Sequence, residues 1–158
     1  MKNLPVIILA TITTTVVSCK KEAQAVSGSA TSINTRKAIV TSNVWKVTSF
    51  MEKGIDRTPD FSTYLFQFNS DGSAIANSTG IGILYYGTSN LLKVIHTTLD
   101  DSGNHSGSEE QKLIITLTGN HHMDEINEDW KIVKLIGTEM WLMDNNIASS
   151  KEIHFTMN

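Results

Sequence analysis

Alternation of apolar and polar residues in short segments is the feature that most constrains the fold of this chain. It is clearest where the apolar positions are Tyr64, Phe66 and Phe68, then Leu113, Ile115 and Leu117, and finally Ile153, Phe155 and Met157. Successive side chains of a strand point to opposite faces, so each segment predicts a strand with one buried face. With further runs rich in β-branched and aromatic residues, the sequence predicts eight or nine strands: Val44–Met51, Ser62–Phe68, Ser73–Thr79, Ile81–Gly87, Leu91–Leu99, Lys112–Thr118, Trp130–Ile136, Glu139–Asn145 and Lys151–Met157.

The segments between these strands are mostly short and rich in turn residues. Asn69-Ser70-Asp71-Gly72 predicts a hairpin turn, because its glycine tolerates positive φ. Residues 100–110 predict a polar loop, and helical turns are expected only near residues 38–42 and 124–128. Evenly spaced antiparallel strands favour a barrel or a sandwich, and closure removes exposed sheet edges. We therefore expect an all-β fold, an up-and-down antiparallel β-barrel of about eight strands with little helix.

The first 19 residues have the pattern of a secretion signal. Lys2 supplies a positive charge, and Leu4–Val17 is an uncharged, mostly apolar run of 14 residues. As a helix this run would span about 21 Å, too short for a bilayer core of about 30 Å but sufficient for a signal peptide. Val16-Val17-Ser18-Cys19 resembles the bacterial lipobox, and Cys19 is the only cysteine of the chain. Residues 1–18 are thus predicted to be a signal peptide and Cys19 to be lipidated; the alternative is an ordinary secreted protein.

Residues 19–37 are rich in Ser, Ala, Thr and basic side chains, without an apolar period. They predict a lipidated cysteine followed by a flexible linker, with the folded domain at 38–158. We expect the chain to be lipid-anchored in the bacterial cell envelope, at the outer membrane. The single acidic residue after Cys19, Glu22, leaves the choice between the periplasmic and the surface face open.

Composition and motifs exclude several classes of function. The hydrophobic share of 40% indicates a folded chain, and a net charge of −3 argues against a nucleic-acid partner. Gly80–Tyr85 lacks the third glycine of a dinucleotide-binding loop, and Gly103–Gly107 is not a serine nucleophile motif.

The best metal candidate is His121-His122-Met123-Asp124-Glu125. On a helix His121 pairs with Asp124, or His122 with Glu125; a third ligand, such as His105, is not placed by the sequence. We therefore expect no metal, no cofactor and no enzymatic activity.

Several of these segments together resemble a known family. They are Asn43-Val44-Trp45-Lys46-Val47-Thr48, Tyr64–Gly72, Trp130–Leu135, and a last hairpin from Met140-Trp141-Leu142 to Ile153-His154-Phe155. With the lipobox and linker, they are similar to the small lipocalin-like lipoproteins of Gram-negative bacteria over residues 38–158. The chain has Asn43 where lipocalins have the glycine of Gly-x-Trp, and it lacks their later Thr-Asp-Tyr motif. The resemblance implies an eight-stranded up-and-down barrel and leaves the ligand open.

The sequence leaves three functions to be distinguished. The first is a barrel that binds a small hydrophobic or amphipathic ligand, lined by Trp45, Tyr64, Phe66, Phe68, Trp130 and Phe155. The second is an envelope interaction or scaffold protein whose barrel is filled by these side chains and whose outer surface binds partners. The third, least favoured, is a barrel enzyme acting through His121 and His122. The membrane is a partner through the lipid, and the sequence does not indicate an oligomeric state.

Overall fold

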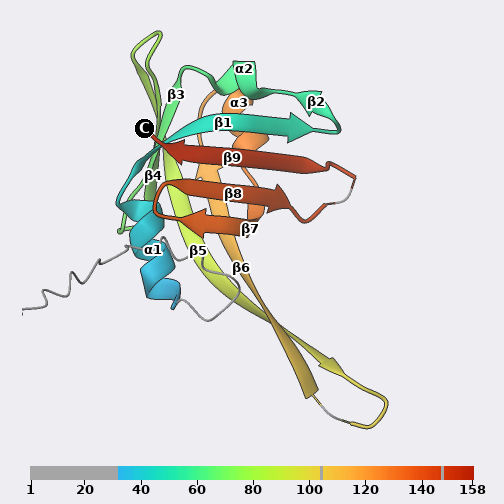
Figure 1. The fold of residues 1–158 in the computed structure, drawn as a ribbon. Coiled ribbons are helices and arrows are strands. Elements are labelled where there is room, and N and C mark those ends of the chain that lie inside the picture. The colour runs from blue at the N-terminus through green and yellow to red at the C-terminus, as the bar shows by residue number, and fades with distance from the viewer. Residues whose placement is uncertain (1–31, 104, 147) are drawn as a thin grey trace, which may run out of the picture.

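The strands form one antiparallel sheet that closes on itself. The structure is a computed structural model, and it describes residues 32–103, 105–146 and 148–158. Strand order in the sheet follows chain order except that the two-residue β2 lies outside β1. Pairing of β1 with β9 closes the ring, as Figure 1 shows. The fold is thus the predicted up-and-down antiparallel barrel of eight strands, with β2 as a short addition at its edge, and it is consistent with a lipocalin-like fold.

The strand boundaries agree with the sequence except for the two-residue β2, which was not predicted, and in the middle of the chain. The strands are β1 Val44–Glu52, β2 Ile55–Asp56, β3 Tyr64–Phe68, β4 Ser73–Ser78, β5 Ile83–Leu99, β6 His105–Leu117, β7 Asp129–Ile136, β8 Glu139–Asp144 and β9 Lys151–Met157. The predicted strands at 81–87 and 91–99 are one continuous strand, β5. The predicted polar loop at 100–110 is wrong from His105 onward, because residues 105–111 pair with β5 along its whole outer length. Residues 105–111 form a strand because they pair with β5, although they have no apolar face.

Three short helices complete the described chain. They are α1 Ile33–Thr41, α2 Thr58–Phe61 and α3 His121–Ile126. α1 begins within the stretch predicted to be a flexible linker, so residues 33–37 are helical; the Ser32 side chain caps it by accepting a hydrogen bond from the Thr35 amide. α3 begins three residues before the predicted turn, and α2 was not predicted. No helix of the described residues is long and apolar enough to cross a membrane. The predicted signal peptide and Cys19 lie outside the described residues.

Two buried tryptophans tie α1 and α3 to the barrel. Trp45, which follows α1 closely in the chain, donates from its indole nitrogen to the Val40 carbonyl at 2.9 Å. Trp130, shortly after α3, donates in the same way to the Ile126 carbonyl at 2.8 Å. Both side chains have no exposed surface. Because the last carbonyls of a helix have no partner within the helix, each indole both fills the core and satisfies a helix end.

The turn between β3 and β4 has the predicted form. Gly72 has φ +89°, a conformation that favours glycine, and its amide bonds to the Asn69 carbonyl at 3.0 Å. The Asp71 carboxylate accepts hydrogen bonds from the Ser73 amide at 2.9 Å and from the Ser73 hydroxyl at 2.8 Å. These bonds hold the pKa of Asp71 below its usual value. The hairpin prediction is therefore confirmed.

Candidate functional site

The six aromatic residues predicted to line the barrel all lie in its core. Tyr64 is 5% exposed and the other five, Trp45, Phe66, Phe68, Trp130 and Phe155, are completely buried. Four of these rings contact one another: Phe155 lies 5.6 Å from Phe66 and 6.3 Å from Phe68 between ring centroids, both edge to face. Tyr64 continues this stack at 6.3 Å from Phe66. Four of the six rings thus pack against one another, and Trp130 lies edge-on to Phe50, a further core residue, at 6.3 Å. A role of the six residues in ligand binding stays a prediction.

The polar groups beside this core bond to one another. The Asn120 side-chain amide donates to the hydroxyls of Tyr64 and Tyr85, both at 3.1 Å. The amide oxygen of Asn120 caps α3 by accepting from the His122 and Met123 amides. Burial, with the neighbouring Tyr64, raises the pKa of Tyr85. Asn120 therefore joins α3 to β3 and β5, and these hydroxyls have a structural partner.

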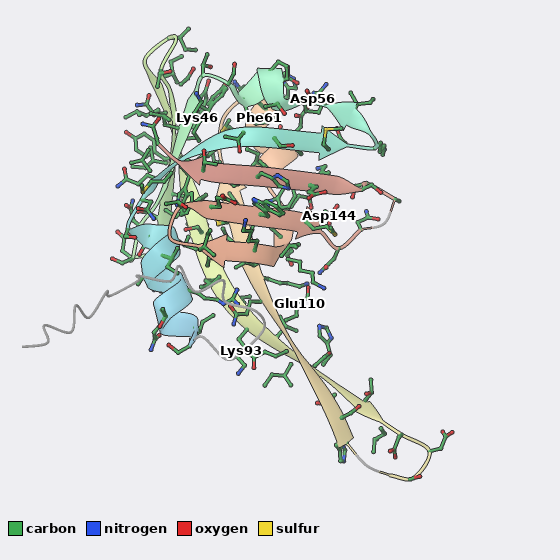
Figure 2. The ribbon with its side chains drawn as sticks, viewed as in Figure 1. Lys46, Asp56, Phe61, Lys93, Glu110 and Asp144 are labelled. Atoms are coloured by element: carbon green, nitrogen blue, oxygen red, sulfur yellow. The ribbon has the colours of Figure 1, made fainter. Side chains whose placement is uncertain are left out.

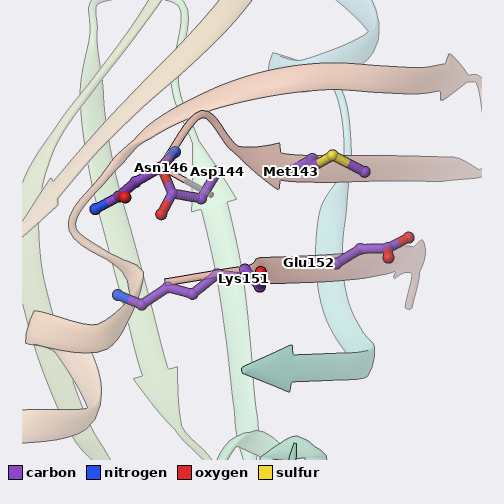
Figure 3. Close-up of a pocket in the computed structure, with 6 residues that line it drawn as sticks. Met143, Asp144, Asn146, Lys151 and Glu152 are labelled. Carbon is purple, nitrogen blue, oxygen red and sulfur yellow. The ribbon is translucent and has the colours of Figure 1, made fainter. Parts of the chain in front are cut away.

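A small pocket opens at the connection between β8 and β9, away from the six aromatic residues. Its volume is about 260 Å³, and it is lined by Met143, Asp144, Asn146, Ser150, Lys151 and Glu152, as Figure 3 shows. Pockets for drug-sized ligands measure about 300–1,000 Å³ and are mostly apolar. This pocket is smaller, and Met143 is the one apolar residue among the six that line it, so it offers few apolar side chains to a hydrophobic ligand.

The most unusual surface is a two-stranded arm formed by β5 and β6. We define the arm as residues 92–103 and 105–111. β4 pairs with β5 only as far as Thr88, and β7 pairs with β6 only from Ile114 to Lys112. Beyond these points the two strands pair with each other alone among the described residues, and they extend from the barrel in Figure 1. Both outer edges of the arm therefore present backbone groups without a strand partner.

The arm combines exposed apolar side chains with an excess of acidic ones. Ile95 and Leu99 are each 66% exposed, and Leu92 is 37% exposed. Four carboxylates (Asp100, Asp101, Glu109 and Glu110) stand against one lysine, Lys93. Lys93 pairs with Glu109 at 2.7 Å and His96 with Glu110 at 3.0 Å; Lys93 and Glu110 are labelled near the base of the arm in Figure 2. The hydrogen bond from Lys93 lowers the pKa of Glu109, so this carboxylate is negative at neutral pH.

The histidine cluster lies on α3. It contains the predicted pair His122 and Glu125, and His121 joins them as a third member that the sequence did not predict. One potential ligand atom each of His121, His122 and Glu125 lies within 4.8 Å of the others. Sequence reasoning paired His122 with Glu125, but it did not expect the adjacent His121 to reach the same point. His105, the third ligand considered, lies instead in the arm, on β6. The observable signal was the spacing of His121 and Glu125, which are four residues apart and so share a helix face.

Glu125 is also bonded by an arginine of the β2–α2 connection, Arg57. Arg57 bonds the Glu125 Oε1 atom at 2.5 Å and also pairs with Asp60 at 3.2 Å. The bond to Glu125 raises the pKa of Arg57. The second oxygen, Oε2, is buried without a hydrogen-bond partner, and so is Nδ1 of His122. An unpaired buried polar group costs about 1–3 kcal/mol, so two together call for a physical explanation.

Comparisons with known proteins do not add a function to this geometry. No family model matches the chain. No curated protein and no solved structure matches it at a significant level. The candidate sites therefore rest on the geometry of the described residues alone.

Proposed function

We propose that this chain is a lipid-anchored lipoprotein of the bacterial envelope whose barrel is a rigid platform for the arm, and that the arm binds a protein partner. The observation that supports this most is the arm itself, with two unpaired edges and exposed Ile95 and Leu99. An isolated two-stranded hairpin is only marginally stable in water, so an arm of this length gains stability when another strand adds to it. The lipid anchor rests on the lipobox at Val16–Cys19.

The chemistry of the arm indicates what kind of segment would bind. Ile95 and Leu99 lie four residues apart on one face of β5, the face that Leu91 and Leu113 continue into the core. An extended partner segment would add to a free edge through main-chain hydrogen bonds and place alternate side chains on this face. Because the arm has four carboxylates and one lysine, we propose that the partner segment is basic as well as apolar.

The hypothesis of a small ligand inside the barrel is less well supported by the core packing. We expect the purified full chain to show, by native mass spectrometry, the mass of the polypeptide with its acyl groups and no stoichiometric small molecule. The reason is that all six predicted lining residues are buried and that four of their rings pack against one another. A one-to-one small-molecule adduct, released by organic solvent but not by removal of the acylated N-terminal peptide, would contradict this expectation.

Site-specific photo-crosslinking of the full chain in cells tests the proposed partner. A photo-reactive amino acid at position 95 is expected to capture one basic protein that the same amino acid at position 55 does not capture. Ile55 is a matched control, because it is 63% exposed and also lies in a strand, β2. The captured protein is then identified, purified and titrated with the full chain.

In that titration, Ile95→Lys is expected to weaken binding at least about tenfold, because it removes an apolar contact and adds a positive charge facing a basic segment. Ile55→Lys should leave the affinity unchanged, and added salt should weaken binding of the unsubstituted chain. Equal capture at positions 95 and 55, or equal affinity of the two variants, would overturn the proposal. A crosslinked product with the mass of two copies of this chain would show that the arm binds a second copy instead of a partner. A crosslink to lipid would show that the arm contacts the membrane instead.

A further inference from the structure

The cluster at the start of α3 has the composition of a transition-metal site. Two imidazoles and one carboxylate are a common ligand set for zinc and related divalent cations, which leaves one coordination position for water. His121 and His122 bring their rings to a centroid separation of 3.9 Å, and the potential ligand atoms of the three side chains lie within 4.8 Å of one another. Donors around a tetrahedral zinc are about 3.3–3.5 Å apart, given ligand distances of about 2.0–2.1 Å. Small side-chain rotations would therefore close the site.

The surroundings hold two of the three side chains in place. The His122 ring packs edge-on against Phe61 at 5.7 Å and Tyr64 at 6.3 Å. Glu125 is fixed through Oε1 by Arg57. Asn120 fixes the backbone of the first turn by capping the amides of His122 and Met123. His121 is the exposed member, so a cation would enter from its side.

The atoms left without partners are an independent indication of a missing ligand. Both Nδ1 of His122 and Oε2 of Glu125 are buried and unbonded. These are the two kinds of atom that a divalent cation accepts as ligands, and they belong to two members of the same cluster. The positive charge of Arg57 is offset by Asp60 as well as Glu125, and Lys151 is paired with Glu128 at 2.7 Å. The neighbouring cations are thus each matched by a carboxylate.

We propose that His121, His122 and Glu125 form a binding site for one divalent transition-metal cation of the zinc type. This site is separate from the arm and does not depend on the proposed partner. The competing arrangement is a two-bond pair between Arg57 and Glu125, since Nε of Arg57 is also buried without a partner. In that arrangement Oε2 would be occupied and the cluster would not bind a metal.

Titration of the full chain in mild detergent with zinc chloride, after treatment with EDTA and desalting, tests the site. All chains in this titration include Cys19→Ser, which removes the proposed lipid and, in any chain that is not acylated, the thiol as a zinc ligand. We expect one zinc per chain with micromolar or tighter affinity, and a rise in melting temperature on addition of zinc. His121→Ala is expected to weaken binding at least about tenfold, since even residues that only support metal ligands cost about 10–100-fold. Because His121 is exposed, its loss should leave the metal-free melting temperature unchanged.

His96→Ala is the matched control. His96 is also an exposed histidine beside a glutamate, Glu110, but it lies on the arm. This variant should keep the affinity and the zinc-dependent rise in melting temperature. Cobalt(II) gives a second measurement, because a visible absorption band of a four-coordinate ion should appear in the His96→Ala chain and disappear in His121→Ala. Absence of zinc binding at about 1 mM metal, or equal binding by the His121→Ala and His96→Ala chains, would overturn the proposal.

Discussion

Replacing Gly87 by alanine is expected to destabilise the barrel strongly. Gly87 lies in β5 opposite Leu117, at the point where β5 is held between β4 and β6. A Cβ atom there would lie 1.8 Å from the Thr116 carbonyl oxygen and 2.7 Å from the Leu117 Cα atom. Both contacts are with backbone, so no change of rotamer relieves them. We expect a loss of at least about 3 kcal/mol in the free energy of unfolding, the upper end of overpacking costs.

Thermal unfolding followed by circular dichroism on the full chain measures this loss. For a domain of this size a decrease of about 3 kcal/mol corresponds to about 10 °C or more in melting temperature. Gly107→Ala is the control, because it makes the same change in the partner strand β6, where the nearest atom to the new Cβ is the His96 carbonyl oxygen at 3.9 Å. Alanine there should be neutral or stabilise by about 0.5 kcal/mol. Similar melting temperatures for the two variants would show that β5 and β6 can separate at Gly87 at little cost.

The barrel was predictable because its signals are local. Alternation in β3 and β9 fixes which side chains enter the core, and all of Phe66, Phe68 and Phe155 are buried as expected. The Asn69–Gly72 turn was predictable because a positive φ selects glycine. Such signals need no knowledge of distant residues. They suffice for strand order in an up-and-down barrel, where neighbours in sequence are neighbours in the sheet.

The elements that sequence reasoning missed depend on distant partners. Residues 105–111 are polar and predict a loop by themselves, but each pairs with a residue between Lys93 and Leu99. Residues 33–37 show no apolar period, and their helix is fixed further along, where Val40 is buried and accepts the indole hydrogen bond of Trp45. In both segments the stabilising contact is made with residues outside the segment, so the residue pattern of the segment itself does not predict its structure.

The candidate sites also combine features that local sequence predicts with features that depend on distant residues. Alternation predicts that the aromatic residues of β3 and β9 share one buried face. The choice between packing and lining depends on the spacing of the rings in three dimensions. For the histidine cluster the sequence supplied the residue types, and helical spacing supplied pairs. The positions of the His122 and Glu125 side chains depend on Phe61, Tyr64 and Arg57, which come from a segment about 60 residues earlier in the chain.

Replacing Trp130 by alanine is the second change with a large expected effect. Trp130 is completely buried, lies edge-on to Phe50 at 6.3 Å, and bonds the Ile126 carbonyl at the end of α3. Truncating a buried tryptophan costs about 3–5 kcal/mol through lost packing and the cavity that remains. Here a helix carbonyl also loses its partner, so we expect the loss to lie at the upper end of this range. Urea denaturation of the full chain measures it, with the denaturant slope compared between variants.

Trp141→Ala is the control for this measurement, because it removes the same side chain from the outer surface. Trp141 stacks on His154 at 4.4 Å, and Lys134 lies 4.2 Å above its ring. Contacts of this kind contribute about 0.5–1 kcal/mol at exposed sites, so the loss should be a fraction of that for Trp130. Trp130→Phe then separates packing from hydrogen bonding: it keeps a buried ring but leaves the Ile126 carbonyl unpaired, which should cost about 1–3 kcal/mol. If Trp141→Ala were as destabilising as Trp130→Ala, contacts on the outer face of β8 would stabilise this part of the barrel as much as the buried Trp130 does.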